Sequence, residues 1–244
     1  MIDLLIGVMA GFFIGATGIG AGSILTPLLI LRGYDPVTAV TTGFIALIAA
    51  RKVGSVQHIL SGHWPKRGGL RVLFAGVAGG GIGFLLVHHF ITRTLLFESA
   101  LRLALAVVLL TIGVAGFFSL HLQPRPHFAT VAAAGAGAIV SATSAGSGTL
   151  LGALVFPGTD WRVHEFSAVS NLFGLCTGVI GIAAYMRLDR FDPALLGFVT
   201  AGSILGITAG VFASRRIERT HFALALRVLT IVLGAALAIS WFMA

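Results

Sequence analysis

Long apolar segments separated by short polar turns make up almost the whole 244-residue chain. The longest of these segments cover residues 72–90, 103–120, 194–213 and 222–244. Each is close to the roughly 20 residues that a helix needs to cross the hydrocarbon core of a bilayer. The pattern therefore predicts an all-α, polytopic membrane protein.

The apolar pattern repeats itself, with a polar, Gly-rich break near the start of each half. The segment Thr17-Gly18-Ile19-Gly20-Ala21-Gly22-Ser23 corresponds to Thr143-Ser144-Ala145-Gly146-Ser147-Gly148-Thr149, and Ile91-Thr92-Arg93-Thr94 corresponds to Ile217-Glu218-Arg219-Thr220. Two halves built on one plan are common among secondary transporters. We therefore predict a first transmembrane repeat at residues 1–122, a connector at 123–127 and a second repeat at 128–244.

Each half has the same order of segments. A short apolar stretch (4–16 or 129–140) precedes the break, and a second one (24–31 or 150–156) follows it. The two stretches form either a re-entrant hairpin or two abbreviated spans, and the sequence does not choose between them. Short, Gly-interrupted segments at corresponding positions point to a transport site. About three full spans complete each half, near residues 37–59, 69–90 and 96–120 and near 164–186, 193–213 and 222–243.

The charged residues, only 10 % of the chain, indicate how the halves are oriented. The loop that contains Lys66, Arg67 and Arg71 is basic, whereas its counterpart at 187–192 is neutral, and the next pair of loops reverses this. If basic loops face the cytoplasm, the halves have inverted topology and both termini are periplasmic. The net charge of +8 then needs no nucleic-acid partner. We expect the lipid bilayer and a small anion as partners, and a homodimer stays open.

Both breaks suit an anion. Backbone that leaves regular helix inside a membrane must be buried in protein or line a wet cavity. The amides and the dipole of the half-helix after each break favour negative charge. A second pair of polar stripes, at 38–42 and 167–171, either completes the cavity or only cross-links helices. The anion-binding residues predicted in these elements are Thr17, Gly18, Gly20, Gly22, Ser23, Thr41, Thr42, Thr143, Ser144, Gly146, Ser147, Gly148, Thr149, Ser170 and Asn171.

Two charged residues break the symmetry of the halves. Arg51 and Lys52 lie in a predicted span where the second half has Ile180 and Gly181. Charge within a span usually serves function, so we predict that Arg51 binds the anion. The alternative is that both side chains snorkel to the membrane interface. The predicted gate or coupling residues are Lys52, Gln57 and His58.

Other glycines recur at intervals of four residues. They are Gly7, Gly11 and Gly15, then Gly76 and Gly80, and finally Gly202, Gly206 and Gly210. Small residues at this spacing share one helix face and let two helices approach closely. We therefore predict that these glycines pack helices together.

Other chemistry finds little support. No acidic residue lies in the middle of a span, which argues against a carboxylate proton relay. Transport is then either driven by the anion gradient or coupled through His58 or a proton on the anion. The lone Cys176 and the scattered histidines offer no metal-binding spacing, so we expect no metal and no cofactor. Ser147 could be the nucleophile of an intramembrane serine protease, which is a distant alternative. A serine nucleophile needs a general base, and no histidine lies in the middle of a predicted span. We therefore expect no enzymatic activity.

Several of these elements occur together in one known family. They are Gly15-x-x-Gly18-x-Gly20-x-Gly22 followed by Pro27, the pair Gly146-x-Gly148, the stretch Ala39-Val40-Thr41-Thr42, and His58, Gly62 and Trp64 ahead of a Gly-rich segment. In order and spacing they resemble the sulfite exporter (TauE/SafE) permeases over essentially the whole chain. Ala21 and Ser147 stand where that family usually has glycine.

The resemblance implies a multi-pass protein of the bacterial inner membrane. Members of the family are proposed to export sulfite, sulfoacetate and related organosulfur anions. Together with the two breaks, this leads us to expect a secondary transporter that exports such anions by alternating access. A passive anion channel would share the fold and the site, and is the nearer alternative.

Overall fold

The computed structural model describes residues 1–17, 22–60, 67–90, 94–117, 126–156, 159, 161, 163–186, 192–213 and 219–242. Within these ranges the chain is helical apart from short turns, and it contains no strand. The predicted all-α fold is therefore confirmed.

Five helices of the described part belong to each half of the chain. The first half contains α1 (Ile2–Thr17), α2 (Gly22–Leu31), α3 (Pro36–Leu60), α4 (Arg67–Phe90) and α5 (Thr94–Phe117). The second half contains α6 (Pro126–Thr143), α7 (Ser147–Leu154), α8 (Val163–Tyr185), α9 (Pro193–Ala213) and α10 (Arg219–Phe242).

Aspartate followed by proline begins two of the long helices. Asp35 accepts a hydrogen bond on Oδ1 from the amide of Thr38 at 2.9 Å, at the start of α3. Asp192 accepts two at the start of α9, from Ala194 at 2.8 Å and Leu195 at 3.1 Å. Proline suits the first helical position because it lacks the amide that would be left unpaired there. The carboxylate pairs the next free amides and favours the positive end of the helix dipole.

Four helices of the described part are long and apolar enough to cross a membrane. They cover Gly68–His89, Phe97–Val114, Ala168–Tyr185 and Pro193–Gly210. Shorter apolar helices lie at Ile2–Ile14, Gly22–Leu31, His127–Thr143 and Arg227–Phe242. Large apolar side chains point outward from the bundle, for example Phe74, which is 72 % exposed. An apolar exterior of this kind suits lipid, and the chain is a polytopic membrane protein.

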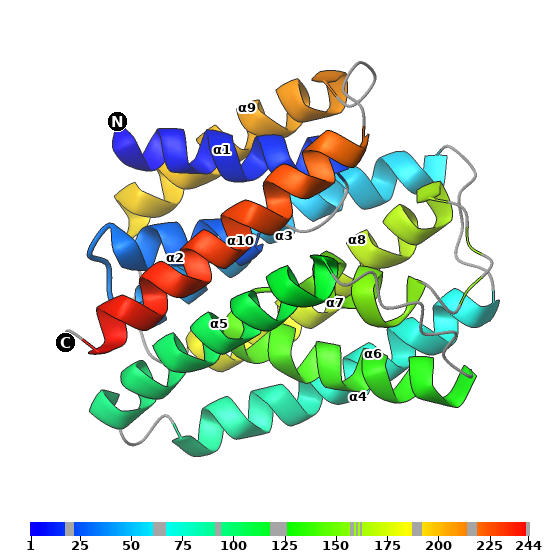
Figure 1. Ribbon diagram of the computed structural model, residues 1–244, viewed down its shortest axis with the longest axis horizontal. Coiled ribbons are helices and arrows are strands. Elements are labelled where there is room, and N and C mark those ends of the chain that lie inside the picture. The colour runs from blue at the N-terminus through cyan, green and yellow to red at the C-terminus, as the bar shows by residue number, and fades with distance from the viewer. Residues whose placement is uncertain are drawn as a thin grey trace.

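The short helices form two hairpins that enter the bundle from opposite ends. In Figure 1, α1 and α3 both begin at the end of the molecule that carries the two termini. The α1–α2 pair therefore enters and leaves at that end. The α6–α7 pair enters from the other end, where α8 also begins. Both arrangements that the sequence left open, a re-entrant hairpin and two abbreviated spans, enter and leave at one end, so the choice between them stays open.

The two halves pack in a reciprocal pattern. α1 lies along α9, and the corresponding helices α6 and α4 also lie side by side. α3 packs against its counterpart α8, and α5 packs against its counterpart α10. Corresponding helices run in opposite directions along the long axis of Figure 1. This is the inverted arrangement predicted from the loop charges, whereas the exact repeat boundaries and the periplasmic termini stay predictions.

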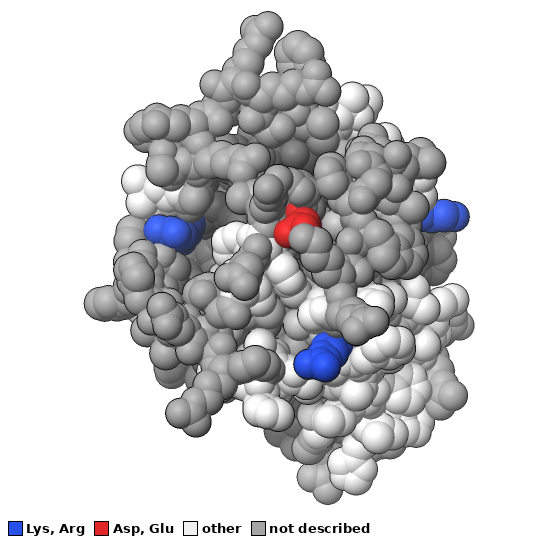
Figure 2. All heavy atoms as spheres, turned by 90° about the vertical axis from the view of Figure 1, so that its right-hand side faces the viewer, with Lys and Arg blue, Asp and Glu red and all other residues white. Residues whose placement is uncertain are grey.

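Figure 2 looks onto the end of the molecule opposite the termini. The basic side chains that the structure describes on this face lie apart from one another, with an acidic side chain among them. Residues 61–66 and 214–218, which carry much of the predicted cytoplasmic charge, lie outside the described residues. The described part of this face therefore forms no continuous basic patch.

Glycines bring the paired helices into backbone contact. A Cβ added at Gly11 of α1 would overlap the carbonyl of Ser203 on α9, and one added at Gly79 of α4 would overlap that of Ala134 on α6. Four members of the predicted glycine series on α1 and α9 face such a contact: Gly7, Gly11, Gly202 and Gly206. On α4, Gly76 and Gly80 instead face the side chains of Phe173 and Ser141. The predicted packing role of these glycines is confirmed.

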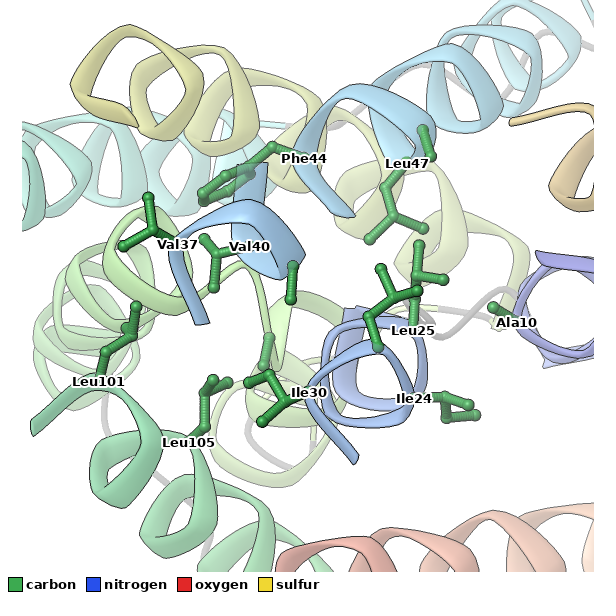
Figure 3. Packing of buried hydrophobic residues seen from close by; sticks show 14 of the residues in the cluster. Ala10, Ile24, Leu25, Ile30, Val37, Val40, Phe44, Leu47, Leu101 and Leu105 are labelled. Atoms are coloured by element: carbon green, nitrogen blue, oxygen red, sulfur yellow. The ribbon is translucent and has the colours of Figure 1, made fainter. Parts of the chain in front are cut away.

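The helix α2 lies inside the bundle. Figure 3 shows Ile24, Leu25 and Ile30 of α2 beside Val40 of α3 and Leu105 of α5. Eight of its ten residues are buried, including Ser23, Thr26 and Pro27. The hydroxyls of Ser23 and Thr26 therefore lie in the interior of the bundle rather than against lipid.

Candidate functional site

The start of α2 touches the break between α6 and α7, so that the tips of the two hairpins meet. A Cβ added at Gly22 would overlap the carbonyl oxygen of Ser144. One turn further along α2, the hydroxyls of Thr26 and Ser144 form a hydrogen bond of 2.6 Å. Both side chains are buried. The predicted residues Gly22 and Ser144, which come from different halves, are therefore brought together.

The break itself is made by two residues in the left-handed region of backbone space. Ser144 has a φ of 60° and Gly146 a φ of 93°. A left-handed conformation is easy for glycine and costly for serine, so the surroundings must hold Ser144 in place. The hydrogen bond to Thr26 does so. After the reversal, Leu150 donates its amide to the carbonyl of Gly146 at 2.7 Å and α7 begins.

Arg51 reaches the break from α3. Its side chain is 4 % exposed, and Nη2 donates a hydrogen bond to Oγ of Ser147, the first residue of α7. The guanidinium also lies against Gly174 of α8, where an added Cβ would overlap Nη1. Arg51 therefore does not snorkel to the interface. It is held between three helices at the start of the short helix α7.

The described residues hold no acidic partner for Arg51. The ion pair seen among them joins Arg32 and Asp3 at 3.8 Å, near the end that carries the termini. Ser147 offers Arg51 a neutral hydroxyl as acceptor. A buried charge is costly unless it is paired and hydrogen-bonded.

Several buried hydroxyls near these elements are unused. Ser23 of α2 and Thr42 of α3 have no hydrogen-bond partner among the described residues, and the same is true of the Thr149 hydroxyl on α7. Ser55 is 3 % exposed, lies one turn beyond Arg51 on α3 and is likewise unpaired there. Residues four apart share a helix face, so Ser55 and Arg51 face the same way. Unpaired buried donors are costly unless a ligand or water satisfies them.

Other predicted site residues are differently placed. Thr41 and Thr143 bond to carbonyls of their own helices, at Val37 and Ile139. Ser170, Asn171 and Gly148 are buried, whereas Lys52 is exposed. Thr17 is the last residue of α1. The side chains of Thr17, Gln57 and His58 are not among those that the structure describes, and Gly18 and Gly20 lie outside the described residues.

Sequence reasoning missed three residues of this region: Ser55, Gly174 and Tyr185. When the two polar stripes are aligned, Gly174 corresponds to Ile45. A glycine in place of a large side chain could have indicated that another group packs against α8 there. The Tyr185 hydroxyl donates to the carbonyl of Ala142, which the end of α6 leaves without a helical partner. It thereby ties α8 to the break. A lone aromatic hydroxyl at a helix end gave no clear signal.

Comparisons with known proteins identify the family of the chain. A segment of 113 residues is 28 % identical to the probable membrane transporter protein YunE of Bacillus subtilis (strain 168). That match covers 46 % of this chain and 39 % of the relative, so it spans less than half of either protein. No solved structure matches the chain. The family model described as sulfite exporter TauE/SafE matches residues 4–237, and the chain therefore belongs to the sulfite exporter TauE/SafE family of membrane transporters.

Proposed function

We propose that the protein exports small organosulfur anions, such as sulfite, sulfoacetate or a related sulfonate, across the bacterial inner membrane. The observation that carries the proposal is the buried Arg51, which has no acidic partner among the described residues and lies at the start of α7. A carrier of cations or of neutral solutes would have no use for an uncompensated positive charge at this position.

The donors near Arg51 suit an anion with several oxygens. A guanidinium carries five N–H donors in a planar fork, and Ser147 accepts from Nη2 alone. The unpaired hydroxyl of Ser55, one turn along α3, offers a further donor. Sulfite and sulfonates present three oxygens to such a set. The positive end of the α7 dipole adds to the attraction.

The two hairpins suit alternating access. They enter from opposite ends of the bundle and meet through the Thr26–Ser144 hydrogen bond and the Gly22–Ser144 contact. A small relative movement of the halves would expose the region of Arg51 first to one end and then to the other. Inverted repeats around a central site are the usual basis of such movement.

Ser147 is poorly placed for proteolysis. A serine nucleophile needs a general base, whereas the partner of Ser147 is the donor Arg51, which stays protonated. We therefore assign Ser147 to anion binding and propose no catalytic reaction.

The test is flux of labelled sulfite from proteoliposomes that contain the purified protein. We expect saturable flux that sulfoacetate and other sulfonates inhibit, and that sulfate and chloride inhibit less. Flux no greater than from protein-free liposomes, for any of these anions, would contradict the proposed cargo. Unitary currents in planar bilayers would instead identify a passive channel.

A further inference from the structure

We propose that Arg51 makes this protein an obligate anion exchanger, in which the site crosses the membrane only when an anion occupies it. The inference rests on the proposed function and specifies how transport is coupled. It follows from the position of one buried charge between elements of the two halves.

Arg51 cannot leave its position easily. Its guanidinium lies against the backbone of α8 at Gly174 and donates to Ser147 on α7. Only 4 % of the residue is exposed, so its side chain has little contact with solvent. The positive charge therefore stays in the site whether or not an anion is bound.

The described part of the protein does not compensate this charge. The acidic residues of the described part lie at helix ends or beside them, as Asp35 and Asp192 do, and none pairs with Arg51. The Ser147 hydroxyl accepts a hydrogen bond from Arg51, but it carries no net charge. A bound anion supplies the missing charge.

The charge also lies where the halves must separate. Arg51 belongs to α3 of the first half, and its acceptor Ser147 begins α7 of the second half. Relative movement of the halves in the empty protein would strip Arg51 of this acceptor inside a low-dielectric interior. With an anion bound, the charge stays paired throughout the movement. The empty protein is therefore slow to change state and the loaded protein is fast.

Exchange rather than net release is the consequence. An anion delivered to the outside must be replaced by another before the site returns. The hydroxyl of Ser55, one turn along α3 and unpaired among the described residues, favours the loaded state further.

The experiment measures efflux of labelled sulfite from proteoliposomes at zero membrane potential, clamped with potassium and valinomycin. The outside buffer contains either unlabelled sulfite or the impermeant anion gluconate. We expect efflux into sulfite to be about tenfold faster or more. The loaded site would then return across the membrane at least about ten times faster than the empty site. Equal efflux into both buffers would overturn exchange and leave transport standing. No efflux into either buffer would instead contradict the proposed function.

Three variants separate Arg51 from other charges. Arg51→Gln should weaken sulfite binding and, at an internal sulfite concentration that saturates the variant, bring the ratio of the two rates close to one, because the empty site no longer carries a charge. Arg71→Gln removes an exposed charge from α4 and should keep the wild-type ratio. Arg51→Lys keeps the charge and should also keep a ratio well above one. If Arg51→Gln is not recovered as folded protein, loss of the ratio in Arg51→Lys would overturn the role of the charge, and its retention would support it.

Discussion

Arg51 of α3 lies so close to Gly174 of α8 that any side chain at position 174 would overlap its guanidinium group. The contact places a positive charge from the first half against the backbone of the second. It also accounts for two differences between α3 and α8 when these helices are aligned on their polar stripes. Where Gly174 makes room for Arg51, the first half has Ile45, and where the first half has Arg51, the second has Ile180.

Gly174→Ala should therefore weaken sulfite transport. The added methyl group pushes the guanidinium away from Ser147, so we expect the sulfite concentration for half-maximal flux to rise by about tenfold, the order of one lost charge-assisted hydrogen bond. The measurement is the concentration dependence of flux in proteoliposomes. Gly197→Ala on α9 is the matched control, because nothing lies within 4 Å of its added Cβ. An unchanged half-maximal concentration in Gly174→Ala would show that the position of the guanidinium does not matter for transport.

The left-handed backbone at Ser144 predicts a difference between two substitutions. Ser144→Ala and Ser144→Gly both remove the hydrogen bond to Thr26, but only glycine adopts a φ of 60° without strain. We expect Ser144→Gly to be more stable than Ser144→Ala by about 1 kcal/mol. Thermal unfolding in detergent measures the difference. Equal stability of the two variants would mean that the backbone at this position is not strained.

How much of this could be predicted from the sequence depends on the range of the interactions. The helix α4 at Arg67–Phe90 follows the apolar segment predicted at 69–90, because helix length and hydrophobicity are local properties. The break near Ser144 and Gly146 was also visible, since glycine and hydroxyl residues interrupt an apolar run there. The repeat then predicted where its counterpart lies.

The contacts of Arg51 could not be predicted in the same way. Whether it snorkels or turns inward depends on which faces of α3, α7 and α8 meet, and the spacing along one helix does not fix that. The partners Ser147 and Gly174 are far from Arg51 in sequence. Tyr185 was missed for the same reason, because its acceptor at Ala142 becomes free only where α6 ends.

Neighbouring glycines of α4 should respond differently to alanine. A Cβ at Gly79 would overlap the carbonyl of Ala134 on α6, whereas nothing lies within 4 Å of a Cβ at Gly81. We expect Gly79→Ala to lower stability by about 1–3 kcal/mol, as overpacking does, and Gly81→Ala to leave it unchanged. Thermal unfolding of the two variants in the same detergent provides the comparison. Equal loss in both would indicate a general effect of helix composition rather than the α4–α6 contact.

Tyr185→Phe should loosen the attachment of α8 to the break. The substitution keeps the ring, which packs against Phe44 and Phe97, and removes the hydroxyl that donates to Ala142. Because a partly buried carbonyl is left unpaired, we expect a loss of about 1 kcal/mol in the free energy of unfolding. Thr208→Val is the control, since its exposed hydroxyl bonds only to its own helix. A Tyr185→Phe protein as stable as wild type would show that the hydroxyl contributes nothing to the fold.

Ser55→Ala should separate stability from transport. The Ser55 hydroxyl is buried one turn beyond Arg51 and unpaired among the described residues, so that in the empty protein it is a cost rather than a gain. Its removal should leave the thermal midpoint unchanged or slightly higher, while the sulfite concentration for half-maximal flux rises by about threefold to tenfold through loss of one donor to the anion. Ser240→Ala on α10, where the hydroxyl bonds to Leu237, should change neither the flux nor its concentration dependence. If Ser55→Ala lowers the thermal midpoint and leaves flux unaltered, Ser55 serves the packing of α3, and the anion lies elsewhere along the helix.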